Sequence, residues 1–140
     1  HRVNMCKKWL TDNGYDIRHS FMVWCQGCTD GDRGTPTDVY KERTTTVLLD
    51  FLKDAGLDKC FLIQIGNHRD KPELYVRLQR AQEELAAENE DIVMVSRLFK
   101  TFAEKGLMKD EFHYLQEGYN LVGAEAGAKV GRFLERDLNK

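Results

Sequence analysis

The segment Asp110-Glu111-Phe112-His113 contains the residue types of an acid–base pair. On a turn, a carboxylate three residues before a histidine can reach the imidazole Nδ1–H. This contact fixes the tautomer and leaves Nε2 free to act as a general base. The same spacing also fits a solvated surface histidine, which is the more common arrangement. Asp110 and His113 are therefore candidate catalytic residues, with Asp110 orienting His113.

A second polar segment, Trp24-Cys25-Gln26-Gly27-Cys28-Thr29-Asp30, follows an apolar run. On its own, Gln26 is a side chain at a strand end that would bond a loop carbonyl. The Cys25-x-x-Cys28 spacing resembles that of thioredoxin-like oxidoreductases, in which a helix N-terminus lowers the pKa of the first thiol. Residues 26–37 contain three glycines and a proline, which predict a loop and no such helix. Thiol–disulfide exchange at Cys25 and Cys28 is kept as an alternative function. A non-catalytic binding fragment, in which Asp110 and His113 would not be coupled, is kept as another.

Serine, a common nucleophile beside such a base, is rare in this chain. Its two serines, Ser20 and Ser96, do not lie in a Gly-x-Ser-x-Gly or Gly-Asp-Ser setting. Ser20 precedes one apolar run and Ser96 follows another. We therefore assign the role of nucleophile to neither.

Apolar patterns predict the elements that must position these residues. Helical spacing predicts helices from Val3 to Leu10, from Thr37 to Ala55, after a capping box at Asp70 and Glu73, and over residues 117–138. Continuous apolar runs at residues 21–25, 60–65 and 92–95 predict buried strands. This alternation indicates an α/β fold with a parallel sheet and helices on both faces, in which functional groups gather beyond the carboxyl ends of the strands.

Together these segments resemble a known family. Residues 24–30 look like the Trp-x-Gln-Gly-Glu-Ser/Thr-Asp block of the sialate O-acetylesterase and acetylxylan-esterase branch of the SGNH (GDSL-type) hydrolases. Residues 110–119 look like the Asp-x-x-His block at the start of the last helix of that family, and Arg80-Ala81-Gln82 is similar to a helical segment between the two blocks. The resemblance covers nearly the whole chain in the expected order.

The resemblance implies a carbohydrate O-acetylesterase with a three-layer α/β/α, flavodoxin-like fold. His113 would deprotonate a nucleophilic serine, and Asp110 would orient His113 and stabilise its charged form. Gln26 would donate its side-chain amide to the oxyanion, and Gly27 would let the backbone pass close to the substrate. The implied partner is an acetylated carbohydrate.

The sequence departs from the family pattern at two places. Cys28 occupies the position at which the family usually has Glu, which affects the expected subgroup and substrate. The Gly-x-Ser block that carries the nucleophile and the following oxyanion-hole glycine block have no counterpart here. We therefore expect residues 1–140 to form a single, partial SGNH hydrolase domain, with the first strands and the nucleophilic serine upstream of His1. An exposed sheet edge would follow, and dimerisation through that edge is a hypothesis.

Composition excludes several other classes. With 21 basic and 23 acidic residues and a net charge of -2, the chain lacks the charge pattern of a nucleic-acid or anionic-membrane binder. No apolar stretch is long enough to span a bilayer. No cofactor or metal is expected, because a zinc site would need ligands beyond one CxxC pair. Cys6 and Cys60 are interpreted as small core residues, and four cysteines slightly favour a reducing compartment such as the cytoplasm.

Overall fold

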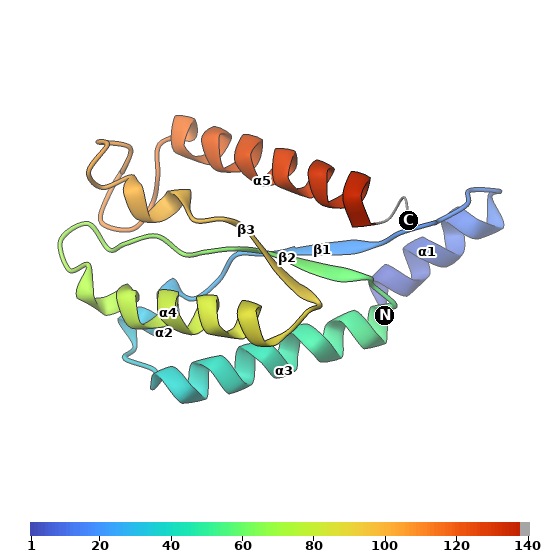
Figure 1. Cartoon of the computed structure of the whole chain (residues 1–140), viewed down its shortest axis with the longest axis horizontal. Coiled ribbons are helices and arrows are strands. Elements are labelled where there is room, and N and C mark those ends of the chain that lie inside the picture. The colour runs from blue at the N-terminus through green and yellow to red at the C-terminus, as the bar shows by residue number, and fades with distance from the viewer. Residues whose placement is uncertain (138–140) are drawn as a thin grey trace.

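The computed structural model describes residues 1–137 as an α/β protein with a three-stranded parallel sheet flanked by helices (Figure 1). The elements follow in the order α1 (Arg2–Asp12), β1 (Phe21–Trp24), α2 (Cys28–Asp32), α3 (Thr37–Ala55), β2 (Lys59–Ile63), α4 (Glu73–Glu88), β3 (Ile92–Ser96), a 3₁₀ helix η1 (Leu98–Thr101) and α5 (Gln116–Asp137). The α/β class and the parallel sheet predicted from the apolar runs are confirmed. The three predicted strands and four predicted helices are all present, and the described ends are shifted by a few residues. The predicted end of the last helix, Leu138, lies outside the described residues.

The sheet has the strand order β1-β2-β3, with β2 in the centre. Phe21 pairs with Lys59 across β1 and β2, and Cys60 pairs with Ile92 across β2 and β3. The register shifts between Leu62 and Ile63, and the amide of Gln64 still donates to the carbonyl of Ser96 at 2.9 Å. The predicted strand over residues 60–65 therefore ends early, and Ile65 leaves the sheet at its carboxyl edge.

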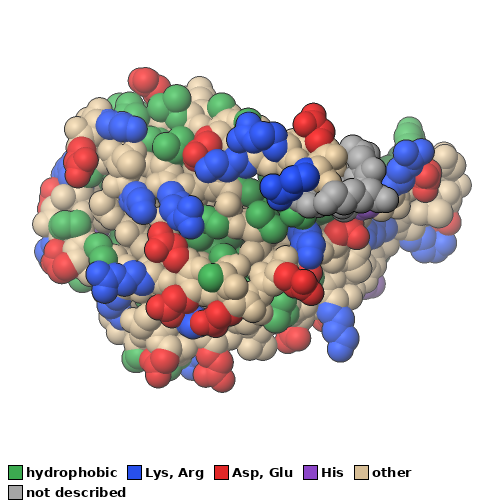
Figure 2. Space-filling model, in the orientation of Figure 1, with side chains coloured by type: hydrophobic (Ala, Val, Ile, Leu, Met, Phe, Trp, Pro, Cys, Tyr) green, Lys and Arg blue, Asp and Glu red, His purple; other side chains and the backbone are tan. Residues whose placement is uncertain are grey.

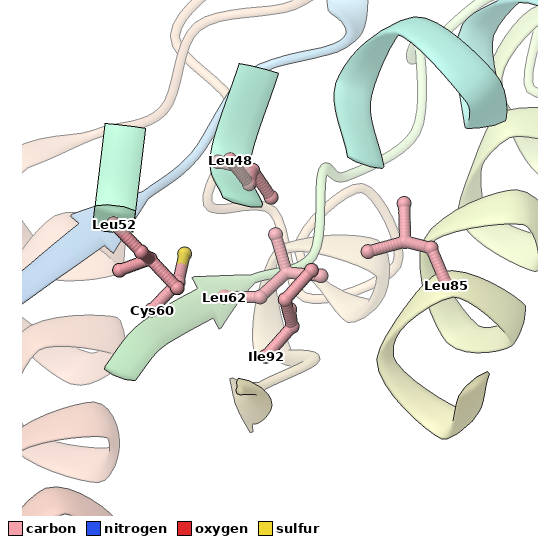
Figure 3. Packing of buried hydrophobic residues seen from close by; sticks show 6 residues of the cluster. All are labelled: Leu48, Leu52, Cys60, Leu62, Leu85 and Ile92. Atoms are coloured by element: carbon pink, nitrogen blue, oxygen red, sulfur yellow. The ribbon is translucent and has the colours of Figure 1, made fainter. Parts of the chain in front are cut away.

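One face of the sheet packs against α3 and α4. Figure 3 shows leucines of both helices meeting alternate residues of β2 and the first residue of β3. The six buried members of this cluster are Leu48, Leu52, Cys60, Leu62, Leu85 and Ile92. Their burial removes a continuous apolar surface from water, which stabilises the arrangement of helices and strands.

The opposite face of the sheet packs against α5 (Figure 1). Phe61 and Val95 point to this face and contact Ala126 of the helix. Because side chains of a strand alternate between its two faces, Cys60 and Leu62 can meet α3 and α4 while Phe61 meets α5. The continuous apolar runs in the sequence follow from this burial on both sides.

α1 is a peripheral helix, which corrects the prediction that Cys6 is a core residue. None of its residues is buried, and the side chains of Met5 and Trp9 are 58% and 60% exposed. Lys7 attaches the helix to the carboxyl end of α3 by donating to the carbonyls of Ala55 and Gly56. Cys60, in contrast, is fully buried as predicted.

The capping box predicted from Asp70 and Glu73 is not formed. Pro72 occupies the N-cap position of α4, with no side-chain cap, and Asp70 instead pairs with Arg69 at 2.9 Å.

Lys and Arg side chains alternate with Asp and Glu over the face shown in Figure 2. Within residues 1–137, no helix has the length and apolar character needed to cross a membrane.

Candidate active site

Asp110 and His113 form the hydrogen bond predicted from their spacing. His113 Nδ1 lies 2.8 Å from Asp110 Oδ2. Asp110 Oδ1 accepts the backbone amides of His113 at 2.7 Å and Phe112 at 3.0 Å. These two amides, followed by the His113 ring, lower the pKa of Asp110 to about 2. The carboxylate is thus ionised near neutral pH, which favours a proton on Nδ1 and leaves Nε2 as the basic nitrogen.

The loop that carries this pair is fixed at both ends. The amide of Lys109 donates to the carbonyl of His113 at 2.8 Å, and the amide of Arg69 donates to the carbonyl of Glu111 at 2.7 Å. Tyr114, next to His113, is buried and forms an aromatic cluster with Phe99 and Phe102. This cluster packs the loop against the segment that follows β3.

Gln26 lies directly beyond the carboxyl end of β1, with both its side chain and its backbone hydrogen bonded. Its Nε2 donates to Asp30 Oδ2 at 2.7 Å, so the partner is a side-chain carboxylate rather than a loop carbonyl. Its backbone carbonyl accepts hydrogen bonds from Gln82 Nε2 at 2.8 Å and Tyr40 Oη at 2.9 Å. The position of Gln26 is thus determined by α3 and α4 as well as by its own strand.

Residues 28–32 form the short helix α2, which corrects the prediction of a continuous loop over residues 26–37. Gly27 precedes α2 with φ 146°, a conformation that favours glycine, and a Cβ there would lie 2.8 Å from Tyr40 Oη. Asp30 stabilises the turn because its carboxylate also accepts the hydroxyl of Thr35 at 3.0 Å. A glycine-rich sequence can therefore form one helical turn when side-chain hydrogen bonds hold it.

The three strand ends and the Asp110–His113 loop meet at a cavity of about 400 Å³, here called the site cavity. It is lined by Cys25, Gln26, Gly27, Cys28, Thr29, Asp32, Ile65, Gly66, Phe99, Phe112, His113, Tyr114 and Tyr119. Gln26 and His113, predicted from separate segments, thus share one cavity, and Asp110 contacts it through His113. The placement agrees with the tendency of parallel sheets to carry sites at the carboxyl ends of their strands.

A buried network of glutamines, which was not predicted from the sequence, supports the site cavity. Gln82 Oε1 accepts the amide of Ile65 at 3.0 Å, in addition to the bond from its Nε2 to Gln26. Gln79 Nε2 donates to the carbonyl of Gly66 and to Asn67 Oδ1, both at 2.8 Å. Both glutamines lie on the buried face of α4, and this interruption of the apolar stripe was the available sequence signal.

The two thiols in the site cavity have raised pKa values. Burial raises the pKa of Cys25, and burial together with the charges of Cys25 and Asp32 raises the pKa of Cys28 to about 11. The reactive thiols of CxxC oxidoreductases require the opposite shift. This observation does not favour thiol–disulfide exchange.

Neither serine lines the site cavity. Ser20 precedes β1, at the amino end of the sheet, where its amide donates to Asp58 Oδ2 at 2.7 Å. Ser96 is fully buried, and its hydroxyl donates to Glu125 Oε2 at 2.6 Å. Neither hydroxyl is therefore placed to act as the nucleophile beside His113.

Within the part of the chain that the structure describes, no group of three or more His, Cys, Asp or Glu side chains is arranged to hold a metal ion. Fold and site together define an α/β protein with a carboxylate–histidine pair at the carboxyl edge of its parallel sheet. Comparison with family models, with curated proteins and with solved structures gives no match.

Proposed function

We propose that this chain is the base-bearing part of a serine ester hydrolase that removes acetyl groups from sugars. The proposal assigns it to the sialate O-acetylesterase and acetylxylan-esterase branch of the SGNH hydrolases, on the sequence resemblance of residues 24–30, 80–82 and 110–119. The whole domain would then have a three-layer α/β/α, flavodoxin-like fold. Additional strands would pair with β1, which lies at the edge of the sheet.

The observation that carries the proposal is the bond between His113 Nδ1 and Asp110 Oδ2. An imidazole held in this way can take the proton of a serine hydroxyl at Nε2 and later return it to the leaving group. The Asp110 carboxylate would stabilise the imidazolium that forms in between. Location at the site cavity gives the pair access to a substrate.

Gln26 supplies a donor for the oxyanion in this scheme. A side-chain amide carries two N–H donors, so Nε2 can keep its bond to Asp30 and still donate to a developing negative charge. The loss of one such donor typically raises the barrier by about 2.7–4 kcal/mol. Gly27 adds backbone next to the cavity without a side chain that could hinder the substrate.

The nucleophile is proposed to be a serine from a segment upstream of His1. The test is to express the gene with its own upstream sequence and to measure hydrolysis of p-nitrophenyl acetate. Activity should be blocked by a serine-directed organophosphate and lost in His113→Asn, while the matched control His19→Asn should retain it. An upstream sequence without a Gly-x-Ser segment would contradict the proposal.

Residues 1–140 alone provide a second test. This chain should show no organophosphate-sensitive turnover, and stoichiometric labelling of Ser20 or Ser96 would contradict the assignment of the nucleophile. If a second copy of the chain covered the edge of β1 instead of additional strands, light scattering would report a dimer. A monomeric mass would count against that pairing.

A further inference from the structure

The site cavity has one polar wall and one aromatic wall. Thr29 and Asp32 reach it from α2, and Phe112 and Tyr119 reach it from the His113 loop and the start of α5. Asp32 has no role in the proposed triad or oxyanion hole. Its position in the cavity therefore calls for a separate explanation.

The position of Asp32 is set by Tyr75, which is 1% exposed. Tyr75 Oη donates to Asp32 Oδ1 at 2.7 Å. Gly31 allows this approach, because a Cβ there would collide with the Tyr75 ring and lie 3.2 Å from the carbonyl of Leu74. Burial and the bond to Asp32 both raise the pKa of Tyr75, so the phenol remains a donor at neutral pH. α2 thus holds the carboxylate on a buried support.

The aromatic wall is also held in place. The ring of Tyr119 packs at 5.6 Å from Tyr114 and 5.9 Å from Phe99, while 43% of Tyr119 remains exposed. Phe112 is 42% exposed and lies 4.5 Å from the ring of His113. Two exposed aromatic side chains beside the base offer an apolar surface to a bound molecule.

We infer that Asp32 is a specificity-determining residue that binds hydroxyl groups of the sugar, while the sugar ring lies against Tyr119 and Phe112. A carboxylate has about four acceptor positions, of which Tyr75 uses one, so Asp32 can still accept hydrogen bonds from hydroxyl groups. The hydroxyl of Thr29 adds a neutral donor and acceptor to the same wall.

An organic cation is the other ligand that a carboxylate and aromatic rings can bind. Two observations favour a hydroxylated ring. The other polar group of this wall, Thr29, is neutral, and the charge of Asp32 is already partly satisfied by the Tyr75 hydroxyl. The choice of a sugar also rests on the proposed function.

The test measures binding, which does not depend on a nucleophile. Methyl 6-O-acetyl-β-D-glucopyranoside is titrated into residues 1–140, and amide shifts are followed by NMR. We expect millimolar binding that shifts residues 29 and 32, and about fivefold or greater weakening in Asp32→Asn, because a hydrogen bond to a charged acceptor is lost. Tyr75→Phe should weaken binding less, because Asp32 remains but loses its support.

Asp38→Asn is the matched control, because Asp38 is an exposed carboxylate on α3 that does not line the site cavity, and it should bind like the parent chain. Absence of binding by the parent chain, or unchanged affinity in Asp32→Asn, would overturn the inference while leaving the His113→Asn test of the esterase unaffected. Tighter binding of tetramethylammonium than of the glycoside would also overturn it. If instead the esterase test fails while Asp32→Asn weakens binding of the glycoside, the site cavity binds the sugar but does not hydrolyse its ester.

Discussion

Gln82 donates its side-chain amide to the backbone carbonyl of Gln26 over a distance of 2.8 Å, across a sequence separation of 56 residues. The same side chain accepts the amide of Ile65 at 3.0 Å. Gln82 therefore connects α4 to the segments that leave β1 and β2. Because it is fully buried, water cannot replace these bonds, and the geometry of the site cavity depends on them.

Replacement of Gln82 by methionine should lower the free energy of unfolding by about 1–3 kcal/mol, because the Ile65 amide would stay buried without its partner. Urea unfolding followed by circular dichroism would measure the change. Arg80→Ala is the control, since Arg80 lies on the exposed side of the same helix, and it should change stability by less than about 0.5 kcal/mol. Equal effects of the two substitutions would contradict a supporting role for Gln82.

The part of the site that could be predicted from the sequence is local. Asp110 and His113 are three residues apart, so a single turn brings their side chains together. The parallel sheet was also predictable, because burial on both faces makes its strands continuously apolar. Gln82 and Gln26 meet only through the packing of a helix on the sheet, and no local pattern indicates that contact.

The loop predicted over residues 26–37 and the burial predicted for Cys6 of α1 were wrong for related reasons. The turn at residues 28–32 depends on bonds from Asp30 to Gln26 and Thr35, which the glycine content of the segment does not show. The apolar spacing of α1 predicted a helix correctly but not its surroundings, because amphipathic spacing cannot say whether a partner surface is present.

Gly66→Ala should destabilise the protein by about 1–3 kcal/mol, because the new Cβ would collide with Tyr114 Oη and lie 2.9 Å from the carbonyl of Phe99. The matched control is Gly123→Ala in α5, where nothing lies within 4 Å of the added atom. That substitution should stabilise the helix by about 0.5–1 kcal/mol. Thermal and urea unfolding of both variants would show opposite signs, and destabilisation by both would contradict this interpretation.

Cys28 should react slowly with iodoacetamide near pH 8. Its pKa of about 11 leaves so little thiolate that alkylation should be about a hundredfold slower than for an unperturbed thiol, and the rate should rise steadily as the pH approaches 11. Mass spectrometry of quenched samples can follow Cys28 beside the exposed Cys6 as an internal reference. Faster labelling of Cys28 than of Cys6 would favour the thiol–disulfide alternative.

The loop that carries His113 should keep its structure well into acid. The pKa of Asp110 is lowered to about 2, so its contribution to loop stability is complete above the ordinary aspartate pKa of about 3.9 and disappears as the pH falls through about 2. NMR titration of the Phe112 and His113 amides should therefore show a midpoint near 2. Asp110→Asn should abolish this transition, whereas Glu111→Gln, which removes the neighbouring carboxylate but keeps Asp110, should leave it in place. A midpoint near 3.9 in the parent chain would mean that, in solution, the amides of Phe112 and His113 do not donate hydrogen bonds to the Asp110 carboxylate. It would also remove the evidence that Asp110 orients His113.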